Sequence, residues 1–268
     1  MKTAVCAIAK DEERDLPEWL AYQFVIGFDS VIVFDNNSTD GTTARVRSAA
    51  SAQDVRLVAW PTQDELAQKN AYEHCIRVFG AEFDWIAFLD IDEFLCFQRF
   101  HSLKDMLDRL SKHSAVAINW AMFGSSGHNT YTSGLVIEDF VMRATSEFAP
   151  NRHVKSIVRP QKVDNCANPH SFNVDGSYCL PSGEAVSWEF LGLCAGTADH
   201  SVCQVNHYFT KSAAHWNDKM RRGYLDGTVR KVEEFAAYDR NEVEDLRAAA
   251  LSGLVRQKLL TFQVSSSG

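Results

Sequence analysis

Short apolar runs alternate with helix-like segments through the first hundred residues. The runs cover residues 3–9, 31–34, 55–60 and 85–89, and the helix-like segments between them cover 15–24, 41–50 and 64–79. Continuous apolar strands between helices are typical of a mainly parallel sheet that is covered on both faces. The sequence therefore predicts an α/β fold with helices flanking a central sheet.

Polar clusters follow each of these runs. They lie at residues 10–12, 35–37, 61–64 and 90–93. Ligands of such sheets bind beyond the carboxyl ends of the strands. We therefore expect these clusters to meet at one edge of the sheet and to form a binding site.

The cluster after residues 85–89 contains Asp90, Asp92 and Glu93. Carboxylates this close repel one another and raise one another's pKa unless positive charge lies between them. Mg²⁺ or Mn²⁺ prefers oxygen ligands and usually keeps substrate phosphates in its shell. Residues i and i+2 of an extended segment point the same way, so Asp90 and Asp92 can converge on one ion. The alternative, a solvated acidic turn, fits poorly with the apolar residues that follow at once.

A histidine and a basic segment form the other notable cluster. His207 ends a short apolar run and could supply the remaining metal ligand as a neutral imidazole, or it could be structural. Lys211 and Arg222 belong to the basic, aromatic segment 208–222. They could hold a diphosphate, or they could lie on a solvated helix face. Lys155, within an alternating segment, could guard a sheet edge or contact an anion.

Composition excludes some classes of protein. The net charge of −8 over 268 residues opposes non-specific binding to nucleic acid. No apolar stretch approaches the ~20 residues of a membrane span. The seven cysteines include no CxxC pair, which favours a reduced, cytosolic setting over a zinc site in the 166–203 region.

Beyond residue 100 we expect helices near 102–112, 208–222 and 240–261, strands near 115–121, 135–142 and 154–159, and loops over 160–200. Neither a repeat nor a linker is evident, so a single domain over 1–268 is predicted. The last helix should pack on the body through Val243, Leu246, Leu254 and Leu259.

The ordered motifs resemble glycosyltransferases of the GT-A fold, close to family two and especially to family ninety-two and its bacterial relatives. The matching segments are 9–12, 35–42, 90–94, 123–128, 153–156, 206–208 and 211–212. Segment 90–94 contains the acid-any-acid motif. The common DDGS of family two reads Asp35-Asn36-Asn37-Ser38 here, which departs from the usual uracil-binding pattern.

The resemblance implies inverting transfer from a nucleotide-sugar, usually a UDP-sugar, to a hydroxyl of a glycan or lipid-linked glycan. It implies Mn²⁺ or Mg²⁺ as cofactor, bound by Asp90, Asp92 and His207. The donor contacts that it implies are Lys10, Glu12, Asp35, Gln68, Asn70, Asp90, Lys211 and Arg222. It also implies a nucleotide-sugar half over about 1–100, an acceptor half over about 101–225 and a helical extension over about 226–268. We expect a cytoplasmic enzyme with at most peripheral contact at the inner face of the membrane.

Inverting transfer also needs a general base. Glu138 follows the strand-like residues 135–137 and a Gly-rich segment that could shape an acceptor cleft, so it is our first candidate. Asp139 and Asp175 come behind it. Two alternative functions remain. A nucleotidyltransferase would need a basic, Gly-rich loop after the first strand, which residues 10–13 do not provide. A non-catalytic binding module is disfavoured by the complete acidic cluster.

Overall fold

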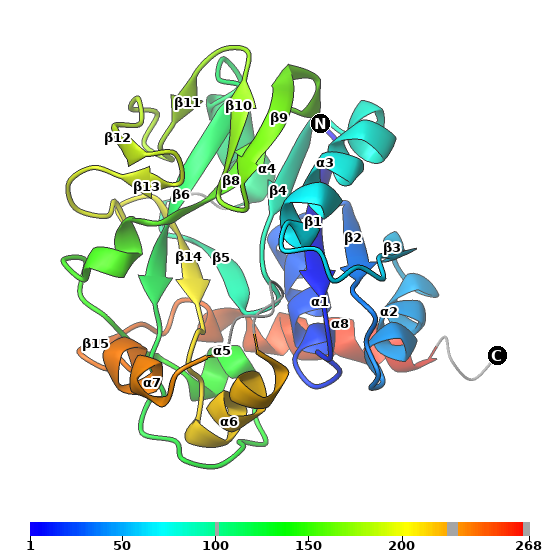
Figure 1. The fold of residues 1–268 in the computed structure, drawn as a ribbon, viewed down its shortest axis with the longest axis vertical. Coiled ribbons are helices and arrows are strands. Elements are labelled where there is room, and N and C mark those ends of the chain that lie inside the picture. Colours follow the sequence, from blue (N-terminus) through cyan, green and yellow to red (C-terminus); the bar gives the residue numbers. More distant parts are fainter. Residues whose placement is uncertain (100–101, 224–229, 265–268) are drawn as a thin grey trace.

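The computed structural model describes residues 1–99, 102–223 and 230–264, with the side chains of residues 222 and 264 excepted (Figure 1). Four strands of the first half lie side by side in the order β3-β2-β1-β4, and all of them are parallel. Their bounds are β1 (Thr3–Ala9), β2 (Ser30–Asp35), β3 (Val55–Ala59) and β4 (Trp85–Phe88).

Helices cover both faces of these strands because successive side chains of a strand point to opposite faces. Val5 and Ala7 of β1 share one apolar core with α1 (Leu16–Ile26) and α2 (Thr42–Ala50). Ala4 and Cys6 share the other core with α3 (Ala67–Phe79). The predicted α/β fold, with a mainly parallel central sheet flanked by helices, is confirmed.

The second half of the chain extends the same sheet beyond β4. The order continues through β8 (Val154–Val158), β6 (Ala115–Met122), β14 (Cys203–His207) and β5 (Glu93–Phe97), and β11 (Tyr178–Cys179) also pairs with β6. β8 is antiparallel to both of its neighbours. Only residues 89–92 separate β4 from β5, although three strands lie between them in the sheet. The sheet must therefore curl, because neighbouring strands are ~4.8 Å apart.

The remaining elements, in chain order, are η1 (Gly80–Glu82), α4 (Leu103–Arg109), α5 (Val136–Asp139), β7 (Met142–Arg143), η2 (Ala149–Arg152), η3 (Pro160–Lys162), β9 (Val163–Asn168), β10 (Ser171–Val174), β12 (Trp188–Phe190), β13 (Leu193–Cys194), α6 (Ala213–Arg222), α7 (Val232–Tyr238), β15 (Val243–Glu244), η4 (Ala249–Leu251) and α8 (Ser252–Val264). The segment predicted as loops thus forms small two-stranded sheets, β9 with β10 and β12 with β13.

The predicted strand over 135–142 is wrong, since α5 and the two-residue β7 lie there. The cause is a distant side chain. Buried Glu18 on α1 accepts hydrogen bonds from the backbone N–H groups of Val136 (2.6 Å) and Ile137 (3.0 Å), which caps α5. Burial raises the pKa of Glu18 to about 7.

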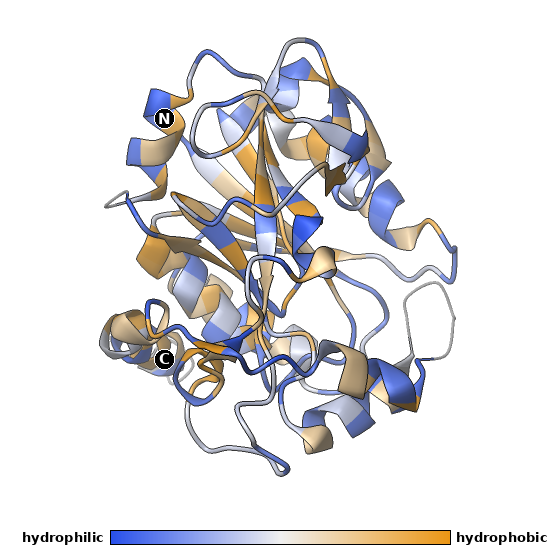
Figure 2. Ribbon diagram, turned by 90° about the vertical axis from the view of Figure 1, so that its left-hand side faces the viewer, coloured by the Kyte–Doolittle hydropathy of each residue, from blue (hydrophilic) through white to orange (hydrophobic). Residues whose placement is uncertain are grey.

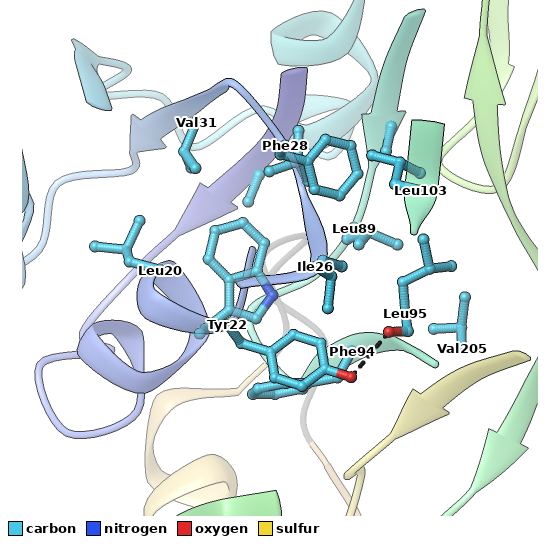
Figure 3. Close-up of a cluster of buried hydrophobic side chains, with 14 of the residues drawn as sticks. Leu20, Tyr22, Ile26, Phe28, Val31, Leu89, Phe94, Leu95, Leu103 and Val205 are labelled. Carbon is cyan, nitrogen blue, oxygen red and sulfur yellow. Dashed lines mark hydrogen bonds between the residues drawn. The ribbon is translucent and has the colours of Figure 1, made fainter. Parts of the chain in front are cut away.

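Helix α1 is attached to the strand that follows the acidic cluster. The Trp19 indole N–H donates to the carbonyl of Glu93, and the Tyr22 hydroxyl donates to that of Leu95, both at 2.9 Å. Figure 3 shows the second bond, with Phe94 beside the Tyr22 ring. These bonds fix the position of β5 and hence of the residues just before it.

Helix α8 packs on α1 and α2 (Figure 1). The predicted helix over 240–261 begins later than expected, and Val243 lies in β15. Leu246 and Leu254 are more than half exposed, while Val255 and Phe262 are buried. The expected packing face was therefore wrong, although Leu259 does pack against the core.

Figure 2 shows apolar strands through the middle of the molecule and hydrophilic segments around them. All seven cysteines are buried and free. Among the described residues, no helix is long and apolar enough to cross a bilayer.

The α8 interface predicts a difference between two neighbouring substitutions. Phe262→Ala should lower the free energy of unfolding by about 3 kcal/mol, because it empties a buried aromatic site. Leu260→Ala, at a residue that is 60% exposed, should change it by less than about 0.5 kcal/mol. Urea unfolding measures both, and equal effects would contradict this packing.

Candidate functional site

A cleft of about 460 Å³ lies beyond the carboxyl ends of β1 and β4. Its walls come from both halves of the chain, including α3, the β9–β10 turn, β14 and α6. Of the predicted site residues it brings together Lys10, Glu12, Gln68, Asp90, Asp92 and His207. The expectation that polar clusters meet at this edge therefore holds for the clusters after β1 and β4.

Two buried lysines provide the positive charge that the acidic cluster requires. Lys155 Nζ lies 2.9 Å from Asp90 Oδ2 and 3.4 Å from Glu93 Oε2. Lys219 Nζ lies 2.5 Å from Asp92 Oδ2. Lys155 is in β8, between two neighbours in the middle of the sheet, so it does not guard an edge.

The pKa shifts follow from burial and these ammonium groups. Burial alone would raise the pKa of Asp90, but Lys155 outweighs it and the pKa is lowered. Burial would likewise raise the pKa of Asp92, yet Lys219 and His207 hold it well below its usual value. Burial raises the pKa of Glu93 well above its usual value, with a further contribution from the two aspartates. Asp90 and Asp92 are therefore the ionised members of the cluster.

Asp90 accepts hydrogen bonds from three protein groups. Its Oδ1 accepts from the Gln68 amide at 2.6 Å and from the Tyr72 hydroxyl at 3.4 Å, and its Oδ2 accepts from Lys155. It thereby connects α3 with β8 in the wall of the cleft, and its side chain is 35% exposed there. The assignment of Asp90 as a metal ligand stays a prediction.

Asp92 and His207 lie side by side, as their predicted shared role requires. His207 Nε2 is 3.5 Å from Asp92 Oδ1, and His207 Nδ1 is buried with no hydrogen-bond partner among the residues that the structure describes. Burial lowers the pKa of His207, which favours the neutral imidazole that a metal needs. Among the described residues, no group of three or more His, Cys, Asp and Glu side chains could hold a metal ion. A metal at Asp92 and His207 would thus depend on ligand atoms from a substrate or from water.

Several predicted donor contacts do not line this cleft. Asp35 accepts weakly from the Ser38 amide at 3.4 Å, and Asn70 donates to Asp64 at 2.9 Å. Lys211 forms an ion pair with Asp15. The side chain of Arg222 lies outside the described residues.

Glu138, our first candidate for the general base, is bonded to other protein groups. Its carboxylate accepts from the Leu135 N–H at 3.2 Å and forms an ion pair with Arg256 on α8. These contacts, against the opposing effect of burial, lower the pKa of Glu138, which makes it a weaker base. It does not line the cleft, and the strand on which its assignment depended is the helix α5. Asp175, an alternative base, is exposed and bonded to Lys162 at 2.7 Å.

A larger pocket of about 710 Å³ lies next to the cleft, between the β1–α1 and β2–α2 loops and α6. Glu12 and Lys219 line both spaces, so the two are neighbours. Lys211 and Asp15 belong to this second pocket. Of the residues predicted for donor binding, Lys211 therefore lines the second pocket and Glu12 lines both spaces, while Asp35 and Asn70 line neither.

Two further residues of the cleft, Trp120 and His170, were not predicted, because no local sequence pattern points to them. Trp120 occupies one position in an apolar strand, and His170 follows a proline in a segment expected to be a loop. Long-range pairing of β8 with β6 and of β9 with β10 brings them to the acidic cluster.

Comparison with known proteins identifies the class. Residues 4–231 match the model of glycosyltransferase family 92, and the chain belongs to this family. It is 32% identical over 208 residues to a family 92 protein of Oryza sativa subsp. japonica, covering 76% of this chain and 32% of that protein. It is 30% identical over 218 residues to a family 92 protein of Ricinus communis, covering 76% of this chain and 34% of that protein. The chain thus spans about a third of the length of the curated relatives it matches.

Solved structures show weaker similarity. TarS of S. aureus in complex with UDP-GlcNAc has a TM-score of 0.43 at 14% identity, covering 99% of this chain and 72% of that chain. Glucosyl-3-phosphoglycerate synthase of Mycobacterium tuberculosis, with Mn²⁺ and UDP, has a TM-score of 0.33 at 14% identity, covering 60% and 57% of the two chains. Similarity at this level carries no argument about what this chain binds.

The lysine–carboxylate network predicts a specific loss of stability. Lys155→Met should lower the free energy of unfolding by about 1.5–3 kcal/mol at pH 7, because it removes the cation from the ionised, partly buried carboxylate of Asp90. Without the ammonium, burial raises the pKa of Asp90 in the folded state. The deficit should therefore shrink as the pH falls from 7 towards 5 and Asp90 becomes protonated.

Lys162→Met is the matched control, since the Lys162–Asp175 pair is solvent-exposed. It should cost less than about 1 kcal/mol. Urea unfolding at several pH values measures both variants. A Lys155→Met deficit as small as the control's, or one that does not change with pH, would contradict the network.

Proposed function

We propose that this chain is the catalytic part of a metal-dependent glycosyltransferase. It would transfer a sugar from a nucleotide-sugar, with UDP as the nucleotide, to a hydroxyl of a glycan or lipid-linked glycan. One observation carries the proposal: ionised Asp92 lies beside neutral His207 in a cleft beyond the strand ends, in a chain of glycosyltransferase family 92. No observation favours a nucleotidyltransferase or a non-catalytic module.

Asp92 and His207 would hold Mn²⁺ or Mg²⁺, with the remaining positions taken by diphosphate oxygens and water. The bound ion would supply Lewis acidity to the departing nucleoside diphosphate. Asp90 takes no part as a ligand in this proposal, because Gln68, Tyr72 and Lys155 occupy its oxygens. Its role is to fix the wall of the cleft.

Lys219 is the cation best placed for the diphosphate. It lines the cleft, and its ammonium donates to both Asp92 and the carbonyl of Phe209. Burial lowers the pKa of Lys219 to about 8, although Asp92 opposes the shift. An arriving diphosphate would offer this ammonium a second anionic partner, and Lys10 lies on the same cleft.

The neighbouring pocket would receive the acceptor, since Glu12 and Lys219 connect it with the donor cleft. In this proposal residues 1–100 supply most of the nucleotide contacts, residues 101–225 complete the cleft, and residues 226–268 support it. Inverting stereochemistry, a general base among Glu138, Asp139 and Asp175, and a cytoplasmic location with at most peripheral membrane contact stay predictions.

Asp92→Asn should weaken Mn²⁺-dependent binding of UDP by at least about 10- to 100-fold, the range seen when the surroundings of a metal ligand are disturbed. Asparagine keeps the shape of the side chain, and its Oδ1 can still accept a hydrogen bond from Lys219, so the fold should survive. Isothermal titration with and without Mn²⁺ measures the effect. Asp108→Asn, at an exposed residue of α4, is the control. Unchanged Mn²⁺-dependent affinity in Asp92→Asn would refute the metal site.

His207→Ala separates a ligand from a structural histidine. A ligand role predicts weaker Mn²⁺ affinity, again by about 10- to 100-fold or more. A purely structural role predicts a lower melting temperature with unchanged metal affinity, because the imidazole packs on Trp120. Titration beside a melting curve tells these apart.

A further inference from the structure

Trp120 brings three imidazoles together at one side of the cleft. The ring centroid of Trp120 lies 4.4 Å from that of His207, 5.0 Å from that of His153 and 5.2 Å from that of His170. Of these histidines, His207 and His170 line the cleft. His207 faces Asp92, which leaves the function of His170 unassigned.

The orientation of His170 is fixed by its surroundings. Its Nδ1 lies 3.0 Å from the backbone carbonyl of Val154. A carbonyl can only accept, so Nδ1 carries the proton and Nε2 is an acceptor. The turn before the ring is also held, because Asn168 Oδ1 accepts from the N–H groups of His170 (2.9 Å) and Ser171 (3.1 Å).

His170 Nε2 has no hydrogen-bond partner in the described parts of the chain, and unlike His207 Nδ1 it is not enclosed by protein. It is therefore an oriented acceptor on a ring that lines the cleft. Burial, together with the nearby Lys155 ammonium, lowers the pKa of His170 to about 3. The ring is thus neutral at physiological pH and too weakly basic for a general base.

The chemistry of such an acceptor limits its partner. A neutral lone pair cannot bind a phosphate, which offers only acceptor oxygens at neutral pH. It needs a hydroxyl or an N–H donor. His170 shares the Trp120 ring with His207, beside which the proposed diphosphate would lie. Gln68 on α3, which the family resemblance places near the nucleotide, bonds Asp90 in another part of the same cleft.

We propose that His170 Nε2 accepts a hydrogen bond from a hydroxyl of the donor sugar and so selects that sugar. The inference rests on the proposed function, since it places a nucleotide-sugar in this cleft. His170 would thus determine donor specificity from the β9–β10 turn, which only the tertiary structure brings to the site.

Isothermal titration of UDP and of a panel of UDP-hexoses, all with Mn²⁺, tests the inference. His170→Ala should weaken binding of the preferred UDP-sugar by about two- to tenfold, the contribution of one neutral hydrogen bond. Binding of UDP alone should not change. With the wild type, a deoxy-sugar donor that lacks the bonded hydroxyl should bind more weakly than the intact donor by the same factor. With His170→Ala, removing this hydroxyl from the donor should weaken binding no further.

His200→Ala is the matched control, because His200 bonds the Trp120 backbone carbonyl at 2.7 Å but lies outside the cleft. It should affect neither ligand. If a melting curve shows that His170→Ala is unfolded, His170→Phe keeps a ring against Trp120 without the acceptor.

The outcomes separate the two claims. Failure of the wild type to bind UDP or any UDP-hexose would refute the proposed function. With that binding intact, unchanged UDP-sugar affinity in the His170 variants would overturn the inference, as would an equal loss for UDP alone.

Discussion

The contacts of buried Lys155 are the interaction on which the site depends. The side chain is 1% exposed and contacts Asp90 and Glu93, which lie in and just after the turn between β4 and β5. Asp90 is the ionised partner, and the fully buried carboxyl of Glu93, whose pKa burial raises, lies 3.4 Å from the same ammonium. Because β8 pairs with β4, the ammonium lies where the ionised carboxylate needs a cation. The turn that carries Asp92 is held at this junction.

Lys219 gives Asp92 a different environment from that of Asp90. Both carboxylates line the cleft, but three protein groups bond the oxygens of Asp90, whereas Asp92 is bonded by Lys219 and, among the described residues, has only His207 beside its other oxygen. Burial has lowered the pKa of that lysine. This difference is the reason for which we propose Asp92, and not Asp90, as the metal ligand. It also means that a metal ion at Asp92 must compete with, or displace, the Lys219 ammonium.

The sequence was informative wherever one local pattern determined the outcome. The apolar runs predicted β1 to β4 because burial on both faces leaves few polar positions, and the clusters after β1 and β4 did reach the cleft. Local patterns led to wrong predictions where residues distant in the sequence determine the structure. Residues 135–137 look like a strand, yet Glu18, more than a hundred residues earlier, caps them as a helix. Likewise, the acidic cluster predicted a metal ion that would balance its charge. In the structure Lys155 and Lys219 supply positive charge there, and no local sequence pattern reveals that their elements lie beside the cluster. His170 carries no signal at all without the β9–β10 pairing.

A crystal structure of the protein with Mn²⁺ and UDP is the most direct test of the central claim, that the carboxylates of this cleft have separate roles. The account predicts Mn²⁺ bound to Asp92, His207 Nε2 and the diphosphate, with Lys155 still on Asp90 and Glu93. The Lys219 ammonium should have turned towards the diphosphate. Mn²⁺ bound by Asp90 with Lys155 displaced, or UDP bound outside the cleft, would contradict it.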